Sequence, residues 1–104
     1  MSDPIKIRAV HAADVTTVRV LMPHPMESGN RKDASGVLRP AHFITDVRIT
    51  CDNVTVLEAA FGPAVSKDPN LSFKFRGGRS GSVIRVVWSD NKGATQRAEA
   101  VVAA

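Results

Sequence analysis

The chain has 104 residues, a formal net charge of +4 and one cysteine. A chain of this length forms one domain that buries roughly two-thirds of the surface exposed on unfolding, so we expect a single domain over residues 1–104. Hydrophobic residues make up 43% of the sequence and charged residues 23%, which argues against a disordered or fibrous protein. One cysteine excludes an internal disulfide, and no stretch approaches the roughly 20 apolar residues of a membrane-spanning helix.

Two strands are predicted before residue 23. Apolar and cationic residues alternate over residues 5–10, as expected for a strand with one wet face. Over residues 15–22, Val18, Val20 and Met22 share one face, and the many β-branched residues favour a strand over a helix. Pro23 ends this strand because proline cannot donate to a ladder.

A polar connection of residues 23–40 follows, opening with Pro23-His24-Pro25 and closing at Arg39-Pro40. A connection this long in a small domain is functional, disordered or an unrecognised hairpin. It therefore carries much of the specific information in the sequence. We place His24, between two prolines, on the surface of this loop.

Five further strands are predicted after the loop. Residues 43–51 place Phe43, Val47 and Cys51 on the core face and Ile44 on the opposite face. Residues 54–61 return as the second strand of a hairpin, and residues 62–70 cross between sheets. Strands follow at 71–76, 83–88 and 95–102, with Trp88 facing inward. Seven short strands with turns about every ten residues predict an all-β, immunoglobulin-like β-sandwich.

The composition and motifs indicate a binding domain without catalytic residues. Lysines and arginines are scattered along the sequence, Arg31-Lys32 is the only adjacent pair, and there is no Tyr, so nucleic-acid binding is not indicated. We interpret these cations as the solvated faces of strands. No catalytic triad order, phosphate loop or dinucleotide fingerprint is present. Cys51 alternates in phase with the core and is interpreted as a buried structural thiol.

The potential metal ligands are few and widely spaced in the sequence. None has the close spacing of a strong metal motif, so we predict no metal site. Glu27 and Asp33 lie in the loop, where each can pair with Arg31 or Lys32, and nothing marks them as an acid/base couple. The potential metal ligands are His11, His24, His42 and Cys51.

Several segments resemble the SoxZ family, the Z subunit of the bacterial sulfur-oxidising multienzyme system. The resemblance covers nearly the whole chain in matching order. It lies in Val18-Arg19-Val20-Leu21-Met22, the segment from His24 to Asp33, Gly36, Pro40, Phe43-Ile44, the segment from Gly62 to Pro69, Phe73, Gly81 and the segment from Trp88 to Gly93.

This resemblance implies a non-catalytic, cofactor-free subunit with an immunoglobulin-like fold. Such proteins pair with a Y subunit (SoxY), which holds sulfur intermediates on the cysteine of a glycine-rich C-terminal arm during thiosulfate oxidation. Other Sox enzymes contact the carrier complex transiently. The resemblance also implies a periplasmic location, reached by export with the Y subunit, because residues 1–6 lack signal-peptide features. It implies neither a nucleic-acid nor a membrane partner.

A second resemblance supports an alternative, a mononuclear metal-binding sandwich. His24-Pro25-Met26 and His42-Phe43-Ile44 are similar to elements of superoxide reductases, which place iron on a similar sandwich. Those enzymes need further histidines and a Cys-Asn-x-His-Gly element, whereas Cys51 is followed here by Asp52-Asn53-Val54. A third hypothesis is an anion-binding adaptor that uses the net positive charge.

We expect the Y subunit to bind an apolar sheet face or edge together with the loop. The sequence leaves open whether the isolated chain is a monomer or a homo-oligomer. The predicted partner-binding residues are Leu21, His24, Met26, Glu27, Arg31, Asp33, Ile44 and Val87.

Overall fold

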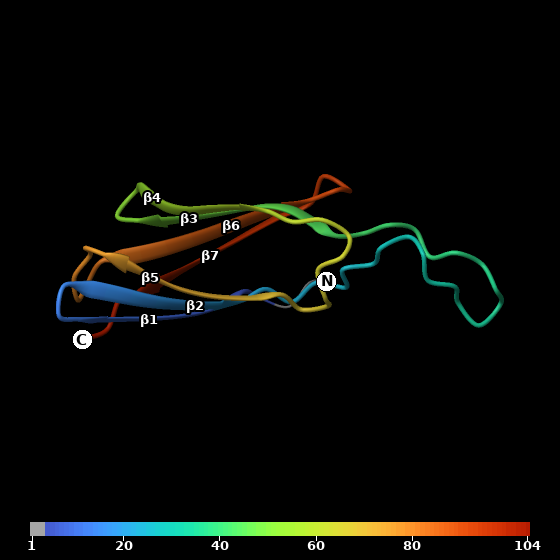
Figure 1. Ribbon diagram of the computed structural model, residues 1–104. Coiled ribbons are helices and arrows are strands. Elements are labelled where there is room, and N and C mark those ends of the chain that lie inside the picture. Colours follow the sequence, from blue (N-terminus) through green and yellow to red (C-terminus); the bar gives the residue numbers. More distant parts are fainter. Residues whose placement is uncertain (1–3) are drawn as a thin grey trace.

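The computed structural model describes residues 4–104, which form seven antiparallel strands in two sheets (Figure 1). Over these residues there is no helix, and hence none long and apolar enough to cross a membrane. The strands are β1 (Lys6–Ala12), β2 (Val15–Leu21), β3 (Ile44–Cys51), β4 (Val54–Ala60), β5 (Asn70–Arg76), β6 (Val83–Asp90) and β7 (Thr95–Val101).

The sheets have the strand orders β1-β2-β5 and β4-β3-β6-β7. Three hairpins, β1-β2, β3-β4 and β6-β7, stay within one sheet. The segment after β4 carries the chain from the four-stranded to the three-stranded sheet, as the sequence predicts. The two sheets stack face to face in Figure 1, which confirms the predicted all-β sandwich.

The core lies between the sheets and follows the alternation read from the sequence. Val18 and Val20 of β2 face Trp88 and the other inward residues of β6, and all of them are buried. Each fully buried aliphatic side chain stabilises the fold by about 1.5–3 kcal/mol. Cys51 is buried in the same core, so its interpretation as a structural thiol agrees with its position.

The prediction that Ile44 faces outward is wrong. Ile44 is fully buried, on the same face as Val47 and Ile49. The pairing of β3 with β6 shifts register between Ile44 and Asp46, as at a β-bulge. A bulge adds one residue to a strand and therefore reverses the side-chain alternation beyond it.

Residues 23–43 form an arm that projects beyond one end of the sandwich (Figure 1). Isolated bridges join Glu27 to His42 and Lys32 to Leu38 in antiparallel pairing. Of the three possibilities for this loop, the structure shows an irregular hairpin. The arm gives the molecule its elongated shape, with principal extents of 54 × 21 × 20 Å.

Candidate functional site at the base of the arm

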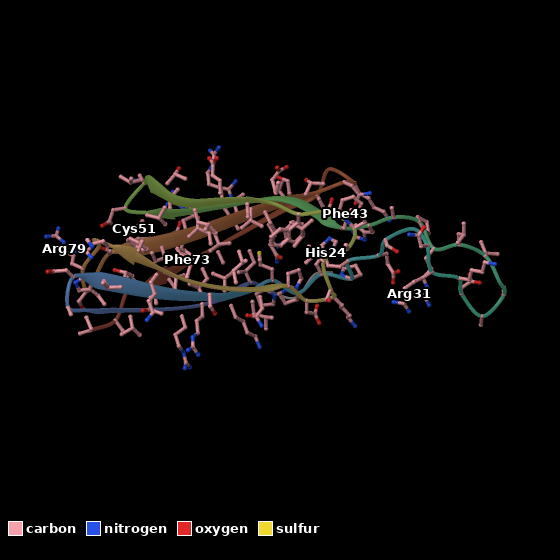
Figure 2. All side chains as sticks on the ribbon, viewed as in Figure 1. His24, Arg31, Phe43, Cys51, Phe73 and Arg79 are labelled. Carbon is pink, nitrogen blue, oxygen red and sulfur yellow. The ribbon has the colours of Figure 1, made fainter. Side chains whose placement is uncertain are left out.

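Two histidines and one aspartate meet where the arm leaves the sandwich. Asp90 Oδ2 accepts hydrogen bonds from His24 Nε2 at 3.1 Å and from His42 Nε2 at 2.9 Å. The two imidazole rings lie edge to face with centroids 4.5 Å apart, and the His24 ring also contacts Trp88 edge-on. Figure 2 shows His24 near the end of the sandwich from which the arm projects. The prediction that His24 lies on the surface is wrong, because only 5% of the residue is exposed.

Asp90 holds its position because it ends β6 and caps the following turn. Its Oδ1 accepts the backbone N–H groups of Lys92 and Ala94, both at 2.9 Å. The next residue, Asn91, exchanges backbone and side-chain hydrogen bonds with Phe43 on the returning limb of the arm. The turn and the arm are therefore joined at several points.

The hydrogen bonds of His24 fix its tautomer. Its Nδ1 lies 3.1 Å from the backbone N–H of Met26 and must accept that hydrogen. The ring proton consequently sits on Nε2 and is donated to Asp90. Met26 itself has a positive φ of 49°, and its sulfur accepts the N–H of Ile44 at 3.3 Å. The strained backbone of Met26 is stabilised by these two hydrogen bonds, one from its own N–H to His24 and one from Ile44 to its sulfur.

The charges of the cluster follow from burial and hydrogen bonding. Burial is the main cause of the lowered pKa of His24, and it outweighs the opposing hydrogen bond to Asp90. Burial alone would raise the pKa of Asp90, but hydrogen bonds from the two imidazoles and two backbone amides lower it below its ordinary value of 3.8. The cluster is thus a carboxylate that accepts a hydrogen bond from neutral His24.

This cluster is the arrangement to test for a metal, because its three ligand atoms lie within 4.8 Å of one another. Nε2 of His24 carries a proton and cannot donate a lone pair to an ion. Moving that proton to Nδ1 would set it against the Met26 N–H, leaving two donors facing each other at 3.1 Å. His42 and Asp90 alone are fewer than the three protein ligands of a catalytic zinc site. The residues therefore do not fit a bound metal ion.

The four potential metal ligands considered from the sequence are not brought together. Cys51 lies at the end of the sandwich opposite His24 (Figure 2). His11 bonds through Nδ1 to the hydroxyl of Thr16, which in turn donates to the Gly77 carbonyl. Only His24 and His42 of the four share a site.

The predicted arm residues divide between a fixed base and an exposed tip. His24 and Met26 are buried in the base, while Glu27 forms ion pairs with Arg31 at 3.3 Å and with Arg39 at 3.8 Å. The prediction that Glu27 pairs with a nearby cation of the loop is confirmed for Arg31. The tip of the arm, residues 31–40, is exposed throughout and includes both of these arginines.

Asp33 has a structural role at the tip. Its Oδ1 accepts the backbone N–H groups of Ser35 and Val37, which shapes the turn. Val37 and Leu38 follow with 60% and 55% of their surface exposed. Sequence reasoning did not single out these two residues, although an adjacent apolar pair inside a polar loop is a readable signal.

The sequence leaves open whether the three predicted sheet residues lie in one apolar patch, and the structure places them apart. Leu21 faces outward from the three-stranded sheet, and Val87 faces outward from the four-stranded sheet. Ile44 lies in the core between them. Sequence reasoning also missed Asp90 as the centre of the cluster, because its contacts span 48 and 66 residues of sequence.

The protein is a two-sheet antiparallel sandwich with a projecting arm and a hydrogen-bonded cluster at the base of that arm. Solved structures have a similar overall fold. The structural alignment with a hypothetical protein, PH1083, from Pyrococcus horikoshii OT3 covers 96% of this chain and 88% of PH1083. The two sequences are 15% identical, and the TM-score is 0.69. One structure of a superoxide reductase (neelaredoxin) from Ignicoccus hospitalis matches 98% and 80%, with 21% identity and a TM-score of 0.66. A second structure of superoxide reductase from Ignicoccus hospitalis covers 97% and 81%, with 23% identity and a TM-score of 0.58. These likenesses show the fold.

A comparison with curated proteins gives no match. Residues 5–101 match the family described as sulphur oxidation protein SoxZ, which is nearly the whole chain. The protein belongs to the SoxZ family, as its sequence resemblance indicates.

Proposed function

We propose that this protein is the non-catalytic Z subunit of a sulfur-carrier complex in thiosulfate oxidation. It pairs with a Y subunit that carries the sulfur intermediate on a cysteine, and the complex works in the periplasm. The observation that supports this proposal is the match to the SoxZ family over residues 5–101. The chain's own thiol supports the same assignment, because Cys51 is buried and burial raises its pKa, which makes it a poor sulfur carrier.

We infer that the arm is a principal contact for the Y subunit. Its base is fixed by the Asp90 cluster and by two backbone hydrogen bonds between Glu27 and His42, at 2.7 and 2.8 Å. Its tip exposes Val37 and Leu38, with no covering element from the described chain. A preformed apolar tip binds a partner at a small cost in conformational entropy. Arg31 and Asp33 lie in the same tip.

The experiment is a binding titration with the Y subunit from the same system. A Val37→Ser/Leu38→Ser double variant should bind the Y subunit at least tenfold more weakly, because it removes the exposed apolar contact. Val54→Ser is the matched control, since Val54 is 65% exposed at the start of β4, and it should stay within twofold of the parent. Unchanged affinity of the double variant would remove the arm from the interface, and failure of the parent to bind would contradict the Z-subunit assignment.

The chemistry of the cluster opposes the metalloenzyme alternative. The hydrogen bonds of His24 and the separation of Cys51 from that site both oppose a metal centre. The likeness to superoxide reductases is one of fold.

A further inference from the structure

The outer face of the three-stranded sheet carries an uncompensated positive charge. Strand pairing brings together lysines and arginines that are scattered in the sequence, and all of them are exposed. The outward positions of β1, β2 and β5 contain no aspartate or glutamate. Side chains that end in nitrogen atoms, drawn blue, project from the outer face of the three-stranded sheet in Figure 2. The residues of this cationic face are Lys6, Arg8, Arg19, Lys74 and Arg76.

These cations have no partners within the described chain. None of them takes part in a salt bridge or side-chain hydrogen bond between residues 4 and 104. Arg8 and Arg19 lie directly opposite each other in the β1-β2 pairing. Like charges in directly opposed positions destabilise a sheet, so folding gains nothing from this arrangement. An arginine pair that weakens the sheet and gains no structural contact indicates that these residues serve a function.

The outer face of the four-stranded sheet has the opposite charge arrangement, with each of two arginines paired to a glutamate on the neighbouring strand. Arg48 and Glu58 are opposite each other on β3 and β4, with 3.1 Å between their charged atoms. Arg85 and Glu99 are likewise opposed on β6 and β7, at 2.9 Å. The four-stranded sheet thus pairs opposite charges across its strands, whereas the three-stranded sheet pairs arginine with arginine.

We propose that the cationic face is a docking surface for an acidic patch on a transiently bound partner protein. The proposal rests on the proposed function, in which enzymes bind and leave the carrier complex. Short polar residues and half-buried aliphatic residues, such as Thr17 and Leu21, separate the cations, as in a protein interface. Single-stranded nucleic acid would need aromatic stacking, but Phe73 and Phe75 of β5 point into the core. A permanent partner is disfavoured because it would desolvate five cations.

Complementary charge raises the association rate more than it lowers the dissociation rate, which suits repeated brief encounters. The rate gained in this way falls steeply with ionic strength, because the Debye length shortens to about 3 Å at 1 M salt. The salt dependence of the association rate is therefore the signature of this surface.

The test compares two single charge reversals in the complex with the Y subunit. Arg19→Glu reverses a charge at the middle strand of the cationic face, and Arg97→Glu reverses an exposed arginine on the opposite sheet. Both change the net charge by the same amount. Association with each purified enzyme of the same sulfur-oxidation system is measured at low and high salt. For at least one enzyme, Arg19→Glu should lower the low-salt association rate at least tenfold and flatten its salt dependence, while Arg97→Glu stays within twofold.

Equal effects of the two reversals on every enzyme, or rates independent of salt, would overturn the proposal. So would a loss of Y-subunit binding in Arg19→Glu, which would place the face in the permanent interface. Duplex DNA and phosphatidylglycerol vesicles serve as further probes. The proposal would also be contradicted if Arg19→Glu, but not Arg97→Glu, abolished binding to either probe while enzyme association stayed unchanged. Y-subunit binding by the parent chain is measured first, so failure of the proposed function is seen separately. In that case the chain alone is tested against the same enzymes.

Discussion

Replacing Asp90 by asparagine should destabilise the fold by about 3 kcal/mol. The asparagine keeps one carbonyl oxygen for the two amides of its turn, but its NH₂ group then faces the Nε2–H donors of His24 and His42. His24 cannot change tautomer without opposing the Met26 N–H. The variant thus leaves a buried imidazole donor unsatisfied, at about 1–3 kcal/mol, and loses hydrogen bonds to a charged acceptor, each worth about 1.5–3 kcal/mol. Little is lost at His42, whose side chain is 28% exposed and can be hydrated.

The assay is urea denaturation followed by the fluorescence of Trp88, the single tryptophan, which contacts the His24 ring. A loss of this size corresponds to a fall in melting temperature of roughly 10–20 °C for a domain of about 100 residues. Asp14→Asn is the control, because Asp14 is exposed in a turn with a φ of 66° that asparagine tolerates equally. If Asp90→Asn stayed within about 0.5 kcal/mol of the parent, the hydrogen bonds of the cluster would not stabilise the fold.

Two further changes test the interior. The pKa of His24 is lowered in the folded chain, so as pH falls below 6.5 the unfolded chain is protonated first and the urea midpoint should decrease. The pKa of Asp90 is also lowered, so a second decrease should follow below pH 3.8. A urea midpoint that does not change between pH 8 and pH 3 would refute both expectations. Gly78→Ala should cost about 1–3 kcal/mol, because its Cβ would lie 2.7 Å from Thr16 Oγ1 at a φ of +69°. Gly36→Ala has a φ of +79° with no atom within 4 Å of its Cβ, so it should cost less, and equal costs would show that the contact is unimportant.

The strands could be predicted from the sequence because the side-chain alternation is local. Val18 and Val20, or Val86 and Trp88, are read correctly within a few residues of chain. Ile44 was assigned to the wrong face because a bulge depends on how two strands pair, which alternation in one strand does not reveal.

The candidate site could be predicted only in part, for a related reason. His24 lies between two prolines and looks exposed, but the partner that buries it lies 66 residues further along the chain. The cationic face was missed in the same way, since Arg8 and Arg19 become neighbours only through the register of β1 and β2. Contacts made by the topology are not visible in the spacing of residues along the sequence.

Native mass spectrometry tests the central claim most directly. The chain is measured alone and mixed with the Y subunit of the same system, with and without added ferrous iron. We predict a one-to-one complex and no metal-sized mass increment on either the lone chain or the complex. A lone chain that binds one iron and forms no complex would contradict the account, and His24, His42 and Asp90 would then be the residues to replace.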